Sequence, residues 1–116
     1  MYDSTADTIE HIGKVRARLQ TVISELTIRA VHHDESKLQE PEKSGYDYWK
    51  PILKTLPEDS PEMEQARREM GVILDHHVKA NPGHHPSGNP NGIADMTLID
   101  LIEMLCDWRA AADEKP

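Results

Sequence analysis

The residues of this chain best suited to chemistry are its histidines and carboxylates, and one short segment concentrates them. The run His32-His33-Asp34-Glu35-Ser36-Lys37 combines two imidazoles, acidic side chains and a lysine. Imidazole nitrogens and carboxylate oxygens are common ligands of divalent transition metals, and an ammonium group attracts phosphate. The segment therefore predicts a metal site with a cation beside it.

Other ligands for such a site would have to come from distant parts of the chain. The candidates are His11, His76, His77, His84, His85, Asp100, Glu103 and Asp107. At about 100° per residue, His33 shares the apolar stripe of its helix, whereas His32 points well away from it. By the same reasoning His77 faces inward, and His76 lies about 100° away from it. We therefore expect His33 and His77 to be the inward members of their pairs.

A long helix is expected before the histidine-rich segment, because apolar residues recur there at spacings of three, four and seven: Ile9, Ile12, Leu19, Ile23, Leu26 and Ala30. An unbroken helix would hold His11 roughly 33 Å from His33. His11 can thus join the site only if the helix breaks. Residues 20–24 are the best candidate for a break, since three β-branched residues there precede Ser24, a candidate N-cap.

Further helices are predicted over residues 46–56, over 61–79 with Ser60 as N-cap, and from Asp95 or Thr97 to about Ala112. Residues 80–92 hold three prolines and three glycines, so we expect an irregular loop there. Whether His84 or His85 of that loop enters the site is left open. The predicted fold is all-α: a single compact bundle of about five helices over residues 1–116, with a Gly/Pro/His-rich loop before the last helix and a frayed tail at 112–116.

Two features of the predicted helices allow more than one interpretation. In the last helix, Asp100, Glu103 and Asp107 form an acidic line opposite an apolar face of Leu98, Leu101, Ile102 and Leu105, so the line is either solvated or a polar seam within the bundle. The aromatic residues Tyr46, Tyr48 and Trp49 are expected to cover the core, and stacking on a nucleobase is the alternative.

Composition narrows the classes of partner. The formal net charge of −8 argues against broad contact with a nucleic-acid polymer or an anionic membrane, both of which need a basic surface. The sequence shows neither an apolar signal core nor a membrane-spanning stretch. The single Cys106 excludes an intrachain disulfide, and we expect it to be a small buried hydrophobe. These features favour a soluble protein of the cytoplasm, and the apolar helix surface is compatible with a homodimer.

The order of these residues along the chain resembles a known enzyme class. Successive helices that carry His, then His-Asp, then further His and Asp resemble the HD-domain superfamily of metal-dependent phosphohydrolases, in which a lysine matches Lys37. Residues 29–38 with Pro41-Glu42, and residues 103–108, resemble more closely a small domain family of unknown function found in phages and bacteria. That second resemblance spans roughly residues 9–111, and it implies that the protein works in a bacterial or phage-infected cell.

The superfamily resemblance implies a ligand set, a cofactor and roles for individual residues. Metal ligands would be His11, His33, Asp34, His77, His85 (or His84) and Asp107, holding one or two ions of Mn, Fe, Co, Ni or Zn. Asp34, Lys37 and Glu103 would be catalytic, with Glu103 acting either as general base or by orienting a histidine. Lys37, His84 and His76 would contact the substrate.

The function expected from this resemblance is hydrolysis of a nucleotide or other small phosphate ester by metal-activated water. One alternative is a non-catalytic helical accessory protein, of phage interaction or anti-defence type, in which metal only stabilises a small core. A further alternative is a dinuclear iron oxygenase, because HD-type ligand sets also hold pairs of iron ions.

Overall fold

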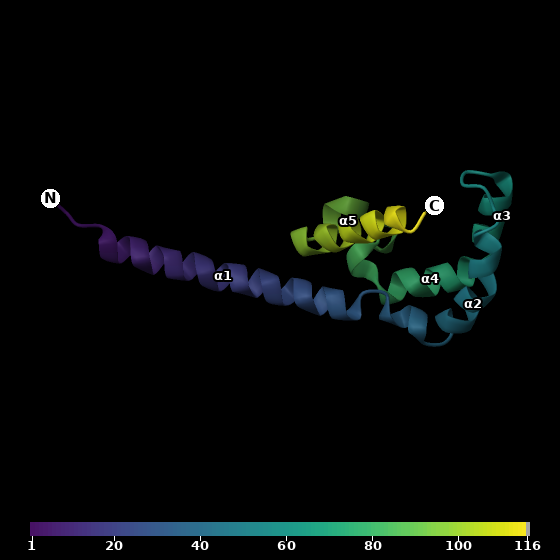
Figure 1. Ribbon diagram of the computed structural model, residues 1–116, viewed down its shortest axis with the longest axis horizontal. Helices are drawn as coiled ribbons and strands as arrows, with labels where there is room; N and C mark the ends of the chain where they lie inside the picture. The colour runs from purple at the N-terminus through teal and green to yellow at the C-terminus, as the bar shows by residue number, and fades with distance from the viewer. Residues whose placement is uncertain (116) are drawn as a thin grey trace. The chain divides into compact units, whose positions relative to one another are not determined.

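The computed structural model describes residues 1–115, and their secondary structure is helical without a strand. The α-helices are α1 (Thr5–His32), α2 (Glu42–Leu53), α3 (Pro61–Glu69), α4 (Gly71–Ala80) and α5 (Leu98–Asp113) (Figure 1). Short 3-10 helices connect them: η1 (Glu35–Leu38), η2 (Pro82–His84), η3 (Pro86–Gly88) and η4 (Gly92–Asp95). The prediction of an all-α fold with about five helices is therefore confirmed. Of the expected frayed tail, Pro116 lies outside the described residues.

The chain divides into two units, Met1–His32 and His33–Pro116. The first unit consists of α1 and the residues before it, and the second holds the other four α-helices. Every member of the segment from His33 to Lys37 belongs to the second unit. The histidines and carboxylates described below are therefore brought together within that unit alone.

Helix α1 runs without a break, so the interruption considered at residues 20–24 does not occur (Figure 1). The hydroxyl of Thr21 donates to the carbonyl of Ala17 (3.2 Å), and that of Thr27 donates to Ile23 (2.9 Å). Such bonds let β-branched threonine satisfy its hydroxyl inside a helix. His11 consequently stands about 31 Å along the helix from His32. The condition under which His11 could join His33 in one site is not met.

The region predicted as one helix over residues 61–79 is two helices, α3 and α4, that meet at Met70. Met70 has φ −77° and ψ 0°, which departs from α-helical geometry, and the following Gly71 has low helix propensity. The predicted N-cap is confirmed, because the Ser60 side chain accepts a hydrogen bond from the backbone N–H of Met63. The chain changes direction at Met70, so α4, which carries His77, runs at an angle to α3 (Figure 1).

Helix α5 buries its polar side rather than the face with the most aliphatic residues. Asp100 and Met104 are buried, whereas Leu98 is 72% exposed and Leu105 is 56% exposed. The acidic line of α5 is thus a polar seam, one of the two interpretations that the sequence left open, and the opposite apolar face is exposed at Leu98 and Leu105. Cys106 is exposed for the same reason, contrary to the expectation of a buried hydrophobe.

The apolar core of the second unit is small and rich in methionine. Among the described residues its buried members are Met63, Ala66, Met70, Met96 and Met104. Tyr48 is 66% exposed, so the expectation that it covers the core was wrong. Helix α2, which begins four residues earlier than expected, packs against α4 at Gly45. A Cβ built on Gly45 would lie 2.6 Å from Cδ1 of Ile73, so glycine allows the close approach that brings Glu42 to α4.

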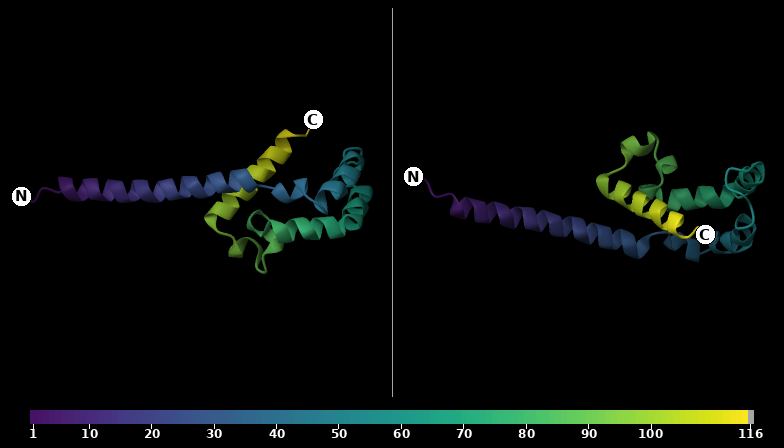
Figure 2. Two further views of the ribbon diagram at one scale, coloured as in Figure 1. Left: turned by 90° about the horizontal axis from the view of Figure 1, so that it is seen from below. Right: turned by 45° about the horizontal axis from the view of Figure 1, so that its top comes forward.

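The loop over residues 80–92 is not a featureless coil, because it folds into short 3-10 turns between α4 and α5 (Figure 2). Pro82 and Pro86 start two of these turns, and the Asn89 side chain donates to the carbonyls of Pro82 and His85 (both 3.0 Å). These bonds fix the backbone on both sides of His84 and His85. Within residues 1–115 we find no helix with the length and hydrophobicity that a bilayer-spanning segment requires.

Candidate metal centre

Asp34 lies at the centre of a cluster of imidazoles, in the turn that follows α1. Its backbone is left-handed (φ 54°, ψ 21°), a conformation that aspartate adopts more readily than most residues, and it forms the N-cap position of η1. A left-handed residue at this point stops the helix from continuing. The side chain is mostly shielded from solvent, with 19% of its surface exposed.

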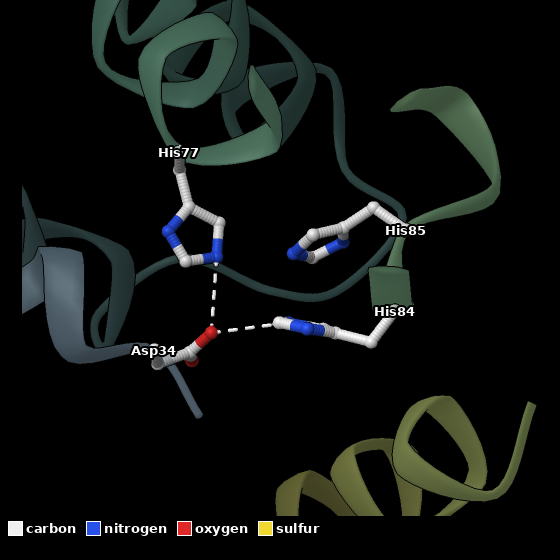
Figure 3. A group of neighbouring side chains, drawn as sticks. All are labelled: Asp34, His77, His84 and His85. Atoms are coloured by element: carbon white, nitrogen blue, oxygen red, sulfur yellow. Dashed lines mark hydrogen bonds and ion pairs between the residues drawn. The ribbon is translucent and has the colours of Figure 1, made fainter. Parts of the chain in front are cut away.

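Three histidines from α4 and the following loop surround this carboxylate (Figure 3). Nε2 of His77 lies 3.2 Å from Oδ1 of Asp34, and Nε2 of His84 lies 3.1 Å from the same oxygen. The ring of His85 packs against both, at centroid distances of 4.9 and 4.1 Å. Asp34, His77, His84 and His85 each offer one ligand atom, and these four atoms lie within 4.8 Å of one another.

A second group of candidate ligands shares one member with the first. His33, His84 and Asp107 also offer ligand atoms within 4.8 Å of one another. Nε2 of His33 lies 3.5 Å from Oδ2 of Asp34 and 3.6 Å from Oδ1 of Asp107. The two oxygens of Asp34 thus face different histidines, Oδ1 toward the first group and Oδ2 toward the second.

Two further carboxylates lie behind the rings and bind their other nitrogens. Glu42, which is fully buried, accepts from Nδ1 of His77 (2.6 Å) and from Nδ1 of His76 (2.6 Å). Oε2 of Glu103 lies 2.8 Å from Nδ1 of both His33 and His84. A carboxylate on Nδ1 fixes the ring and leaves Nε2 to bind an ion, which is the usual arrangement around metal-bound histidines. Glu103 therefore occupies the position of a ring-orienting residue, one of the two roles considered for it.

The electrostatics of the cluster favour an added positive charge. Burial pulls the pKa of Asp34 upward, but hydrogen bonds from His77, His84 and Lys37 outweigh it, so the pKa lies well below its usual value. Burial disfavours the charged form of His77, yet its bonds to Asp34 and Glu42 raise its pKa above 6.5. In Glu42, hydrogen bonds from Ser36, His76 and His77 likewise outweigh burial and lower the pKa. These carboxylates stay ionised at neutral pH and would stabilise a cation between the rings.

His85 differs from its neighbours because its Nε2 is buried and has no hydrogen-bond partner. Burial, together with the nearby His84 and His77, lowers the pKa of His85 to about 4. Its ring is therefore neutral at physiological pH, with a lone pair available on an imidazole nitrogen. A buried polar atom without a partner is costly in a native protein and usually points to an ion or water.

Lys37 approaches the cluster from η1. Its Nζ lies 2.9 Å from Oδ2 of Asp34 and 5.0 Å from the centre of the Tyr46 ring. Burial and the negative charges of Glu42 and Asp34 raise the pKa of Tyr46 to about 12. The Tyr46 side chain is therefore uncharged, and its ring lies under the ammonium group of Lys37. The lysine is thus held at the edge of the candidate ligands.

The structure brings together most of the residues that the sequence pointed to. His33, Asp34, Lys37, His77, His84, His85, Glu103 and Asp107 lie in or beside the cluster. The sequence left open whether His84 or His85 would enter the site, and both rings lie in the cluster. His77 is buried and His76 is partly exposed, as helical phase predicts. His76 lies behind Glu42, and His11 lies on α1 in the other unit.

The sequence reasoning missed Glu42 as a functional candidate. It lies at the start of α2, next to Pro41. It contacts His76 and His77, which follow it by 34 and 35 residues in the chain. The only signal for it was the resemblance of the Pro41-Glu42 pair to the small phage and bacterial family. Without the packing of α2 on α4, an acidic residue in the first turn of a helix is explained by the helix dipole alone.

Comparisons with other proteins place the chain in a family without assigning it an activity. Neither the curated proteins nor the solved structures give a match. One family model covers residues 1–115, which include every residue of the cluster described above. The chain therefore belongs to DUF5662, a family of unknown function.

Proposed function

We propose that this protein is a metal-dependent phosphohydrolase that acts on a nucleotide or another small phosphate ester. The observation that supports it best is the arrangement around Asp34. Nitrogen atoms of His77, His84 and His85 converge on one carboxylate, and Glu42 and Glu103 bind the opposite nitrogens of His77 and His84. This is the donor set that Mn, Fe, Co, Ni or Zn accepts.

The side chains fit a bound ion in three independent respects. Nε2 of His85 is buried and lacks a partner that an ion would supply. Four carboxylates (Asp34, Glu42, Glu103 and Asp107) surround the rings, so a divalent cation would reduce their mutual repulsion. His77 is held between two of these carboxylates, and an ion would take the place of a proton on it.

Two ions fit the residues better than one. His84 belongs to both ligand groups, but its Nδ1 is bound to Glu103, which leaves only Nε2 for one ion. Asp34 is the residue able to serve both groups, because its two oxygens face different histidines. His77, His84 and His85 would hold one ion, His33 and Asp107 would hold the other, and Asp34 lies between the two groups.

A divalent ion at such a site lowers the pKa of coordinated water and balances the charge of phosphate oxygens. The residues around it perform the remaining tasks. Lys37 binds a phosphate oxygen, and the Tyr46 ring holds its ammonium group in place. Asp34 stays ionised at neutral pH and would keep its negative charge toward the ions. Glu103 keeps the rings of His33 and His84 in the orientation that exposes Nε2.

A structural role for the metal is the second candidate, because the apolar core is small. Only five apolar residues are buried within residues 1–115, and four of them are methionines. Segments from η1, α4, η2 and α5 meet at the cluster, so an ion there would crosslink them and stabilise the fold. In that case the protein would be an accessory module rather than an enzyme.

The test combines metal analysis with a substrate screen. Asp34→Asn keeps the size of the side chain, and asparagine tolerates left-handed backbone. Asp47→Asn is the control, because Asp47 is exposed on α2 and its carboxylate forms an ion pair with Lys43. We expect wild type and Asp47→Asn, purified without chelator, to carry transition metal and to hydrolyse at least one nucleoside mono-, di- or triphosphate. Asp34→Asn should lose both properties.

Two results would contradict the proposal in different ways. If Asp34→Asn lost its metal yet kept full hydrolytic activity, catalysis would lie elsewhere in the chain. If wild type bound metal, and lost thermal stability on chelation, but hydrolysed no phosphate ester with any of the five metals, the structural role would replace the enzymatic one.

A further inference from the structure

Helix α1 carries an apolar stripe that nothing in its own unit covers. None of its side chains is buried, and Ile12, Leu19 and Ile23 are 50%, 57% and 54% exposed. An apolar groove follows this face of the helix from His11 to Ile23. In most proteins a helix gains its stability from packing an amphipathic face, so an uncovered stripe of this length indicates a partner.

The stripe has the spacing of a two-helix seam. Its members alternate at steps of three and four, an average of 3.5 residues per turn: Ile9, Ile12, Arg16, Leu19, Ile23, Leu26 and Ala30. The positions that would flank the seam between residues 8 and 27 carry no charge: Thr8, Gly13, Val15, Gln20, Val22 and Thr27. Arg16 is the only charged residue in the seam up to Ala30.

A second copy of α1 fits this stripe better than an unrelated helix. Two-fold symmetry supplies an identical apolar face without further requirements. In a pair centred on Thr21, residue 10 of one copy lies opposite residue 32 of the other, so the two helices overlap over residues 10–32, a seam roughly 33 Å long. Because the charged residues Asp7, Lys14 and Arg18 lie away from the seam, pairing does not bury them.

Arg16 decides how two copies would be oriented. In a parallel pair it would lie directly against its counterpart, which places like charges in an apolar seam. In an antiparallel pair centred on Thr21, Arg16 lies opposite Leu26 and about 15 Å along the axis from the other Arg16, beyond the Debye length of about 8–10 Å. The antiparallel register centred between Arg16 and Leu19 would leave the two arginines only about 4.5 Å apart along the axis.

We propose that α1 pairs with α1 of a second copy as an antiparallel two-helix coiled coil centred near Thr21. The chain is then a dimer whose contact is made by the first unit. This inference does not depend on the metal centre or on the proposed hydrolysis.

The first test is the mass of the full-length protein in solution, measured by sedimentation equilibrium over a concentration series. We expect wild type to be a dimer. Leu19→Glu should weaken dimerisation by at least about 100-fold, because it places an unpaired carboxylate from each copy in the apolar seam. Thr21→Glu adds the same charge on the opposite face of the same turn and should leave the dimer intact. Circular dichroism of both variants checks that they remain helical.

The second test measures the orientation. A spin label at Glu10→Cys, in a Cys106→Ser background, would be separated from its counterpart by at least about 33 Å along the axis of the antiparallel pair. In a parallel pair the two labels would lie at the same level. A monomeric wild type, a dimer unaffected by Leu19→Glu, or a short label distance would each overturn the proposal.

Discussion

Replacing Glu42 by glutamine tests whether the carboxylates behind the histidines prepare the site for a metal. Glutamine has nearly the same size, but it offers one carbonyl oxygen where glutamate accepts from two rings at 2.6 Å. One of the two imidazoles must then face an amide NH₂, which cannot accept from Nδ1–H. His77 loses the charge-assisted bond that fixes its ring, and Glu42→Gln should weaken binding of Zn²⁺ or Mn²⁺ by about 10- to 100-fold.

This loss corresponds to about 1.4–2.7 kcal/mol of binding free energy. It is measured by competition with a chromogenic chelator at neutral pH, with Glu40→Gln as the matched control. Glu40 is exposed and accepts from the backbone N–H and the hydroxyl of Ser44, so the metal affinity of Glu40→Gln should equal that of wild type. Unchanged metal affinity in Glu42→Gln, in a protein that is folded by circular dichroism, would refute the argument that Glu42 orients His77.

Other variants and conditions test the same cluster and core. His85→Phe removes the buried nitrogen that has no partner, so the unfolding free energy of the metal-free protein, measured in urea, should rise by about 1 kcal/mol while metal affinity falls. A less stable metal-free variant would contradict the conclusion that Nε2 is unsatisfied. Metal affinity should decrease as pH falls through the raised pKa of His77, starting above pH 6.5, because the ion must displace the proton of His77. Calorimetry at several pH values would detect the released proton, and an affinity independent of pH would exclude His77 as a ligand. Met70→Ala should lower the unfolding free energy, measured by urea denaturation, by about 2–5 kcal/mol, whereas Val72→Ala, at an 80% exposed position, should lower it by less than about 0.5 kcal/mol. Equal losses in the two variants would show that Met70 is not a core residue.

The metal-free protein should also respond to acid in a way that follows from Glu42. Its folded-state pKa is lower than the ordinary value of 4.5, so its bonds to the histidines stabilise the fold above that pH. The contribution is lost as pH falls from 4.5 toward the folded pKa. The difference in unfolding free energy between wild type and Glu42→Gln should therefore shrink over this range, as followed by urea denaturation at stepwise lower pH.

Local sequence pattern determined several features of this protein. Helical periodicity predicted the all-α class and the orientation of His77 relative to His76, because the angle between neighbouring side chains is set by the backbone alone. The side chains of Ser60 and Thr97 cap α3 and α5 through bonds that span three residues. Such features depend on contacts within a few residues, which a sequence displays directly.

Tertiary packing decided the composition of the candidate centre. Glu42 reaches His77 only because Gly45 lets α2 approach α4, and Glu103 joins His33 and His84 only because α5 turns its polar side inward. The sequence presented two faces of α5 and could not choose between them, since the choice depends on partners up to 70 residues away. A helix pattern fixes which residues share a face, whereas the charges and shapes of distant elements fix which face is buried.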